Sequence, residues 1–387
     1  FEYRVLENGT VCLTKYIGES NDAITPEEID GMSVTSIDNY TFGYFPSLTS
    51  ITISSTITSI DDWAITGCDS LNAIIVDEEN KNFASKDGVL YNKDETKILI
   101  CPVGRSETTF TIPDNVTIIG DRAFSFCRSL ASIEIPDSVT SLGDEVFYHC
   151  SSLSSIEIPK NVIAIGDSVF WGCSSLSLIN VDSENKNFTS KDNVLYSKDG
   201  SELIYYPREK KEKSFIIPHG VTSIANAAFG GKSLTSIEIP DSVILIGNDA
   251  FSGCVSLTAL EIPDSVTSIG RYAFSSCYSL TYVKLPKNAI SIGYSAFSGC
   301  KALTSVEISN GVTKIGLETF RDCVSLTSVK IPNSVTFIDQ RAFVNCSSLT
   351  SIEIPDGVTT IGSGAFENCS SLSTIIIPKS VTRIREN

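Results

Sequence analysis

The chain has 387 residues, of which 42% are hydrophobic, and a formal net charge of −17 at pH 7. This apolar content is sufficient for a continuous core, whereas the acidic charge argues against nucleic acid or an anionic membrane surface as a partner. The sequence contains no run of 18 apolar residues, so no segment is predicted to span a bilayer.

Residues 1–33 are predicted to form an N-terminal cap built on a β-hairpin. Asn8-Gly9 is a strong hairpin signal and favours a type I′ turn. That turn would place Phe1, Tyr3 and Val5 opposite Tyr16, Thr14 and Cys12. Because the chain begins at Phe1 and its one methionine is Met32, we expect a mature chain or a fragment whose start, such as a signal peptide, has been removed.

Residues 34–387 repeat one pattern, L-x-x-I-x-I-P-x-x-V-x-x-I-G-x-x-A-F-x-x-C, which is clearest at residues 129–150. Phe42 and Ile65 hold the aromatic position of the first two copies. After a longer interval the phenylalanine recurs in steps of 22 or 23 residues, interrupted once, at Phe124, Phe147, Phe170, Phe229, Phe251, Phe274, Phe297, Phe320, Phe343 and Phe366. Such a fixed period indicates a single solenoid rather than several globular domains.

Within one repeat, Leu130, Ile133 and Ile135 fit the strand of a leucine-rich repeat, which Pro136 ends. The A-F-x-x-C segment is too short for a full helix and is predicted to form one helical or 3₁₀ turn on the outer face. A glycine column is predicted to adopt a positive φ angle; its members are Gly120, Gly143, Gly166, Gly247, Gly270, Gly293, Gly316 and Gly362. The predicted fold class is an α/β repeat, a right-handed leucine-rich-repeat solenoid with mostly short parallel strands.

Ten of the twelve cysteines occupy one position of the repeat: Cys68, Cys127, Cys150, Cys173, Cys254, Cys277, Cys300, Cys323, Cys346 and Cys369. Disulfide frameworks have irregular spacings, whereas a column at the structural period indicates one buried position that suits a small apolar residue. We therefore predict reduced, structural cysteines.

Two insertions, near residues 76–112 and 181–217, lengthen the repeat and are copies of each other offset by 105 residues. Each contains two short apolar runs around a polar turn, which predicts a hairpin branching from the solenoid. Their acidic starts, Asp77 to Asn80 and Asp182 to Asn185, are rich in oxygen ligands but lack a glycine-punctuated calcium loop, so a solvated turn is favoured over a metal site.

The strand position between the two core residues is predicted to point outward on the concave face. Its charged members are Glu134, Glu157, Glu238, Glu261, Lys284, Glu307, Lys330 and Glu353, and their sign alternates from Glu261 onward. One interpretation is a solvated ladder that supports stability and solubility. The other is a charged strip that binds a ligand, because concave solenoid faces are common binding surfaces.

Catalytic, metal and cofactor sites are not predicted. The two histidines, His149 and His219, lie far apart in the repeat register, which makes a nucleophile–histidine pair improbable. The cysteines lack the clustered spacing that zinc requires. Tyr148 and Trp171 share one outer column and are interpreted as residues packed against neighbouring turns, with a small aromatic contact patch as the alternative.

The repeat pattern resembles that of the BspA-type leucine-rich repeats of bacterial surface proteins, as do the D-G-V-L-Y segment at residues 87–91 and I-D-G-x-x-V-T-S-I at residues 29–37. The resemblance implies a secreted or surface-attached monomer that binds an extracellular protein or glycan of a host or neighbouring cell, without family-wide catalytic residues. A structural spacer with no ligand of its own is the alternative. Because no wall-anchor motif is present and the chain stops before the outer turn of its last repeat, we expect a truncated chain or an attachment outside it.

Overall fold

The computed structural model describes residues 1–207, 212–289 and 291–385, which include all but residues 208–211 of the second insertion. The chain divides into two compact units, Phe1–Asn187 and Phe188–Asn387. The described residues form strands, turns and irregular segments, and they include no helix that could cross a membrane.

The strands of the first unit form five sheets. The first sheet contains β1 (Glu2–Val5), β2 (Val11–Lys15), β4 (Glu28–Ile29), β5 (Met32–Ile37) and β7 (Ser59–Ile60), and the second contains β3 (Asp22–Ile24), β6 (Ser50–Ile53) and β8 (Ala73–Val76). The third contains β9 (Phe83–Lys86), β10 (Val89–Asn92), β11 (Lys97–Ile100), β13 (Ile118–Ile119), β15 (Ser141–Leu142) and β17 (Ala164–Ile165). The last two are pairs: β12 (Thr109–Thr111) with β14 (Ser132–Glu134), and β16 (Ser155–Ile158) with β18 (Leu178–Val181).

The strands of the second unit form three sheets. The first sheet contains β19 (Phe188–Lys191), β20 (Val194–Ser197), β21 (Glu202–Tyr205), β23 (Ser223–Ile224), β25 (Leu245–Ile246), β27 (Ser268–Ile269) and β29 (Ser291–Ile292). The second contains β22 (Ser214–Ile216), β24 (Ser236–Glu238), β26 (Ala259–Glu261), β28 (Tyr282–Lys284), β30 (Ser305–Glu307), β32 (Ser328–Lys330) and β34 (Ser351–Glu353). The third contains β31 (Lys314–Ile315), β33 (Phe337–Ile338), β35 (Thr360–Ile361) and β36 (Arg383–Ile384).

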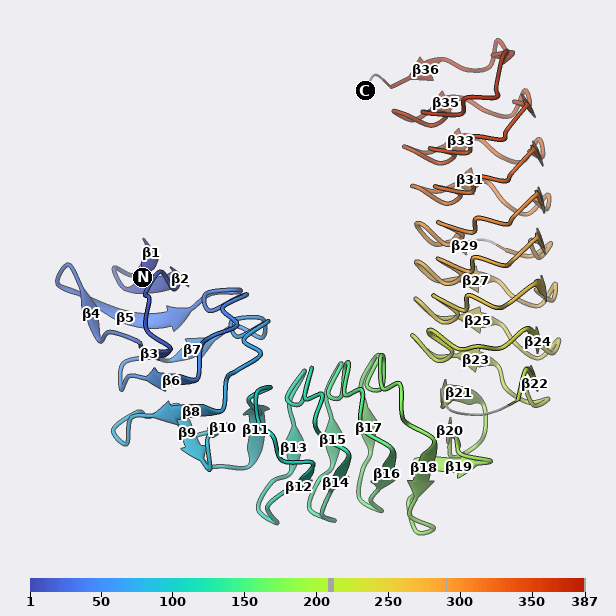
Figure 1. Ribbon diagram of the computed structural model, residues 1–387. Helices are drawn as coiled ribbons and strands as arrows, with labels where there is room; N and C mark the ends of the chain where they lie inside the picture. The colour runs from blue at the N-terminus through green and yellow to red at the C-terminus, as the bar shows by residue number, and fades with distance from the viewer. Residues whose placement is uncertain (208–211, 290, 386–387) are drawn as a thin grey trace. The chain divides into compact units, whose positions relative to one another are not determined.

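Each complete coil has three sides, as the stacked strands of the second unit show most clearly (Figure 1). One side is a strand of three or four residues, the second is a strand of two residues, and the third is the outer turn, which we define as the residues from the glycine position to the cysteine position, such as 120–127. Strands of neighbouring coils pair in parallel, as β15 does with β17. The fold is therefore the predicted leucine-rich-repeat solenoid.

The outer turns contain no helix or 3₁₀ turn among the described residues, in contrast to the prediction. Two residues of each regular outer turn have left-handed φ angles, for example Arg122 (56°) and Phe126 (63°), so a right-handed helix cannot continue through them. Alternate N–H groups instead donate to the next coil: those of Arg122, Phe124 and Phe126 donate to the carbonyl oxygens of Asp144, Val146 and Tyr148 at 2.8, 3.0 and 2.7 Å. This pattern recurs in both units and links outer turns that follow one another by a single repeat.

The glycine column does not have the positive φ angles that the sequence suggested, since none of its members lies in the left-handed region. At positions such as Gly143 and Gly270, glycine is required because the backbones of neighbouring coils approach closely. A Cβ atom at Gly270 would lie 2.4 Å from the carbonyl carbon of Gly247, and one at Gly143 would lie 2.6 Å from the nitrogen of Asp121. The left-handed positions carry many residue types, so their sequence gives no sign of the conformation.

The N-terminal hairpin is present, but its predicted turn and register are wrong. Strand β1 pairs antiparallel with β2, and Tyr3 lies opposite Leu13 while Val5 lies opposite Val11. The N–H of Gly9 donates to the oxygen of Leu6 at 2.9 Å, and Gly9, not Asn8, has a positive φ angle. A type I′ turn needs a positive φ at both central residues, so the chain adopts a longer loop that shifts the register.

The core is a stack of aromatic rings inside the coils. In the second unit the rings of Phe274, Phe297 and Phe320 follow one another at centroid distances of 5.2 and 5.7 Å, with interplanar angles of 9° and 13°. Phe297 is fully buried. Leucine, isoleucine and valine residues from the two strand sides fill the space around the stack.

All twelve cysteines are free thiols and all are buried. In the repeat position, the thiol donates to the carbonyl oxygen of the phenylalanine of the preceding coil, as Cys150 does to Phe124 at 3.0 Å and Cys300 does to Phe274 at 3.2 Å; after the first insertion, Cys127 donates instead to Cys101. Burial raises the pKa of most of these thiols, to about 11 for Cys68 and about 12 for Cys254. The column thus provides a small buried side chain that also satisfies a backbone acceptor.

Replacing Phe297 by alanine is expected to lower the free energy of unfolding by about 3–5 kcal/mol, because a large side chain is removed from a packed stack. Chemical denaturation monitored by far-UV circular dichroism measures this change. Ile163→Ala, at a site that is 64% exposed, is the control and should cost much less. A loss below about 1 kcal/mol for the phenylalanine variant would contradict its place in the core.

The buried thiols also predict a pH dependence of stability. A thiol in the unfolded chain loses its proton near pH 8.5, whereas the raised pKa of a folded thiol keeps it protonated. Stability should therefore be constant below about pH 8 and fall as the pH rises toward the folded values, by up to about 1.4 kcal/mol per thiol per pH unit. Urea midpoints at pH 7.5, 9 and 10 test this. Cys254→Ala/Cys277→Ala should show a shallower fall, and an unchanged slope would show that other groups are responsible.

Candidate functional site

Six of the eight predicted strip residues lie on one sheet of the second unit, one on each of the strands β24, β26, β28, β30, β32 and β34. From β26 to β34 they stand directly opposite one another in parallel register, which places Glu261, Lys284, Glu307, Lys330 and Glu353 in a row. Each of these side chains is exposed, while the residue before it points into the core. The sixth, Glu238, lies opposite Ile216 on β22.

The charges of this row are not paired with one another. Within the described part of the second unit, the ion pairs involve other residues, and none joins two members of the strip. Glu307 accepts a hydrogen bond of 3.2 Å from the hydroxyl of Tyr282, on the neighbouring strand β28. Partial desolvation and this contact raise the pKa of Tyr282. The row therefore presents charges that remain available to an external group.

A groove with a volume of about 1170 Å³ follows the strip from Lys284 to Glu353. Buried isoleucines, among them Ile308, Ile331 and Ile354, lie beneath it. The polar residues that line it are Lys284, Lys287, Glu307, Ser309, Asn310, Ser328, Lys330, Asn333, Ser351, Glu353 and Asp356. Both signs of charge thus border an open, extended surface rather than a closed pocket.

One edge of the groove carries a formed ion pair. The ammonium group of Lys287 lies 2.7 Å from a carboxylate oxygen of Asp264, and the backbone N–H of Lys287 donates to the other oxygen at 3.0 Å. These hydrogen bonds lower the pKa of Asp264 and raise that of Lys287. Because both side chains are largely exposed, the pair orders the edge of the groove without adding much stability.

The remaining two predicted strip residues, Glu134 and Glu157, belong to the first unit. Both are exposed, on β14 and β16. Glu134 accepts a hydrogen bond of 3.0 Å from the hydroxyl of Thr111 on β12. Glu157 lies opposite Asn180 on β18. The strip in this unit is thus acidic and polar, without the alternation of the second unit.

The acidic starts of the insertions are ordered by buried asparagines. Asn80 is fully buried, and its side-chain amide donates to the oxygens of Ser54 and Ile57 at 2.8 and 3.0 Å. Its side-chain oxygen accepts from the N–H groups of Asn82 and Phe83. Asn185 makes the equivalent bonds in the second copy. The sequence did not indicate this role, and the described residues contain no cluster of three metal-ligating side chains.

The two histidines belong to different units, His149 to the first and His219 to the second. The ring of His149 stacks on that of Phe126 with a centroid distance of 5.3 Å and an interplanar angle of 1°, and it contacts Tyr148 edge-on. His219 is exposed in a turn of the second unit. The predicted packing of the outer aromatic column against neighbouring turns therefore agrees with the contacts of Tyr148, although Phe126 was not singled out from the sequence.

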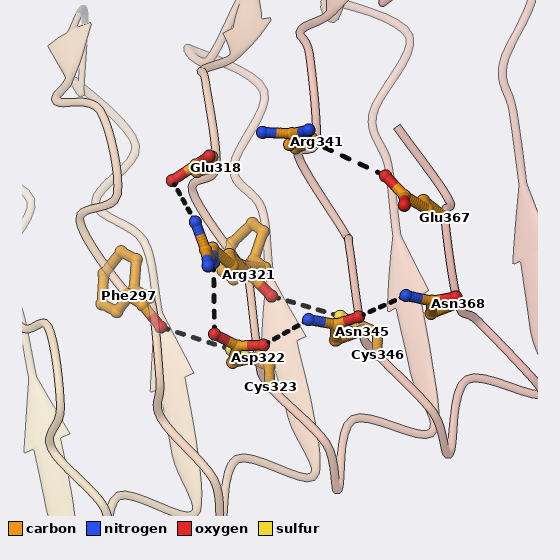
Figure 2. A network of polar contacts seen from close by, with 11 residues as sticks. Phe297, Glu318, Arg321, Asp322, Cys323, Arg341, Asn345, Cys346, Glu367 and Asn368 are labelled. Atoms are coloured by element: carbon orange, nitrogen blue, oxygen red, sulfur yellow. Dashed lines mark hydrogen bonds and ion pairs between the residues drawn. The ribbon is translucent and has the colours of Figure 1, made fainter. Parts of the chain in front are cut away.

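A polar network on the outer turns of the second unit was also missed. The side chains of Asp322, Asn345 and Asn368 hold the left-handed position before the cysteine and form a ladder, with bonds of 2.6 and 2.8 Å (Figure 2). The guanidinium group of Arg321 contacts Glu318 and Asp322 at 3.1 and 3.2 Å. The repeat spacing of 23 residues between these polar side chains is a signal from which the ladder could have been found.

Comparison with protein families supports the repeat assignment. The family model for the BspA type leucine rich repeat region matches residues 20–97, 104–211, 205–324 and 267–387, which is most of the chain. The chain belongs to the BspA-type leucine-rich repeat family. No curated protein sequence matches this BspA-type chain.

Three solved structures similar to this BspA-type protein come from bacteria. A leucine-rich repeat protein of Eubacterium ventriosum is 24% identical with a TM-score of 0.56, and the match covers 99% of this chain and 90% of that one. The pneumococcal vaccine antigen PcpA is 23% identical with a TM-score of 0.57, over 100% and 96% of the two chains. A leucine-rich cell surface protein of Faecalibacterium prausnitzii is 27% identical with a TM-score of 0.46, over 99% and 92%. The first two establish the shared fold.

Asn80→Ala is expected to destabilise the first unit by about 1–3 kcal/mol, because two buried carbonyl oxygens and two N–H groups lose their partner. Thermal unfolding measures the effect. Asn82→Ala, at an exposed position of the same turn, is the matched control and should change the melting temperature little. Calcium should leave both melting temperatures unchanged, and a calcium-dependent increase would contradict the structural role of Asn80.

Proposed function

We propose that this protein is a non-enzymatic binding protein of the bacterial surface and that the groove over β28 to β34 takes its ligand, an extracellular protein or glycan. Membership of the BspA-type family supports an extracellular location. The observation that carries the proposal is the row of alternating charges in register from Glu261 to Glu353, none of them paired with its neighbour.

The spacing of the row suits an extended ligand. Neighbouring strands of a sheet lie about 4.8 Å apart, so charges of the same sign recur about every 10 Å along the groove. A polymer that presents the opposite alternation would meet both signs of charge over a long contact. Ion pairs at such an exposed surface contribute little individually, so recognition depends on several contacts and weakens with salt.

The first measurement is a binding screen of the purified chain on immobilised host-matrix proteins and glycans, at low and high salt. A saturable interaction that weakens at high salt is expected. Glu307→Lys/Glu353→Lys should reduce the affinity about tenfold or more, since close charge pairs across an interface are worth over 1 kcal/mol. Glu7→Lys/Asp94→Lys changes the net charge equally at exposed sites of the first unit and should have no effect. Equal losses in both variants would contradict a site in the groove.

A structural spacer is the second candidate. The observation that favours it is a regular set of hydrogen bonds between coils. The hydroxyls of Thr281, Thr304 and Thr327 each donate to the backbone carbonyl oxygen of the equivalent threonine one coil earlier, at 3.1 Å. Such a stack resists bending regardless of any ligand. The absence of saturable binding across the whole panel would favour this function over the first.

A further inference from the structure

The first insertion interrupts the row of outer turns inside the first unit. The outer turns 61–68 and 120–127 have no complete outer turn between them; the chain instead crosses this position at residues 101–104. The N–H of Cys101 donates to the oxygen of Ala123 at 2.7 Å, and that of Gly104 donates to the oxygen of Leu71 at 2.8 Å. We call the space bordered by residues 61–68, 101–104 and 120–128 the notch.

One wall of the notch has backbone N–H groups without an acceptor, and the other has backbone carbonyl oxygens without a donor, among the described residues. In outer turns that are followed by another a single repeat later, the second, fourth and sixth residues after the glycine position donate to that next turn. Ile65 and Gly67 hold the last two of these donor positions, and neither N–H has a hydrogen-bond acceptor within the described residues. On the facing wall, the carbonyl oxygens of Asp121 and Ser125 have no donor among the described residues, whereas the equivalent oxygens of the next turn, those of Asp144 and Tyr148, accept from Arg122 and Phe126.

The space between these walls is large enough for a side chain. A cavity of about 150 Å³ lies between the outer turns, and a second of about 400 Å³ adjoins it through Thr66, Gly67, Val103 and Phe126, which line both. A cavity of about 150 Å³ accommodates a benzene-sized group. Apolar side chains, including Ile65, Leu99, Val103 and Phe126, form much of the lining of the first cavity.

Two arginines close the ends of the notch. The guanidinium group of Arg122 lies 4.1 Å from the ring centre of Trp63 and pairs with Glu145 at 2.8 Å. Arg128 reaches Asp69 on the opposite wall at 3.4 Å. These contacts fix the width of the notch.

We propose that the notch binds a short extended peptide segment of a partner protein, with one apolar or aromatic side chain in the cavity. The peptide's carbonyl groups would accept from Ile65 and Gly67, and one of its N–H groups would donate to Ser125, because Cys101 already occupies the position opposite Ala123. An added strand gains affinity through such main-chain pairing and specificity through the pocket. A sugar ring would instead need a free aromatic face, but Arg122 covers the Trp63 ring and the Tyr40 ring stacks on it at 6.1 Å.

This site does not depend on the proposed function, because the charged groove belongs to the second unit and the notch to the first. Reversal of Glu307 and Glu353 should leave binding in the notch unchanged. Conversely, a blocked notch should leave binding in the groove unchanged, so failure of one proposal can be distinguished from failure of the other.

The test uses isothermal titration calorimetry of the full chain with acetyl-Thr-Thr-Phe-Thr-Thr-amide. Saturable binding is expected, and replacing the central phenylalanine by alanine should weaken it about tenfold or more, since an apolar side chain leaves the cavity. A peptide N-methylated at its three central residues cannot donate to the oxygen of Ser125 and should also bind about tenfold more weakly or not at all.

Val103→Trp fills the notch from its floor and should abolish binding of the phenylalanine peptide. The matched control is Ile163→Trp, an equally bulky change at an exposed site of the same unit, which should bind like the unaltered chain. Absence of saturable binding, equal affinity for the N-methylated peptide, or binding of cellohexaose or chitohexaose in place of the peptide would each overturn the proposal. The comparison between the peptides uses the unaltered chain, so it tests the proposal even if Val103→Trp fails to fold.

Discussion

The backbone hydrogen bonds between outer turns are the constraint on which the rest of the structure depends. One peptide group serves both neighbours: the oxygen of Asp144 accepts from Arg122, and the N–H of Glu145, in the same peptide group, donates to Asp167. This arrangement requires left-handed residues in each turn, and it brings neighbouring backbones so close at positions such as Gly143 and Gly270 that a Cβ atom there would clash. It leaves the phenylalanine carbonyl for the cysteine thiol, which explains why the column is a cysteine rather than an alanine.

The parts of the fold that could be predicted from the sequence are those that repeat. The phenylalanine and cysteine columns gave the period, and within each unit successive members such as Phe274 and Phe297 are buried and stack on one another. The outward position of the strip followed from the alternation of side chains along a strand, and residues such as Lys284 and Glu307 do stand opposite each other. Repetition makes each inference from one coil apply to the others.

What could not be predicted depends on contacts that no local pattern reveals. The conformation of Arg122 and Phe126 is imposed by the neighbouring coil, against the preference of their side chains. The glycine column was recognised from the sequence, but glycine is present there because the backbones of two neighbouring coils, which are remote along the chain, approach each other closely. Asn80 looked like a surface residue because the two oxygens that its amide group contacts, those of Ser54 and Ile57, lie more than 20 residues earlier in the chain. The notch arises where the period fails, so the repeat itself gives no information about it.

The direction of the hydrogen bonds in the outer turns has an electrostatic consequence. In the second unit, one row runs through the N–H groups of Ala227, Asp249, Tyr272, Ser295, Glu318 and Arg341, each directed at the following coil. Aligned peptide dipoles add, as they do in an α-helix, but here the positive pole lies toward the C-terminal coils because the N–H groups point that way. Acidic side chains on the last outer turns, such as Glu367, therefore lie at the favourable pole, and the stack has a fixed electrical polarity along its axis.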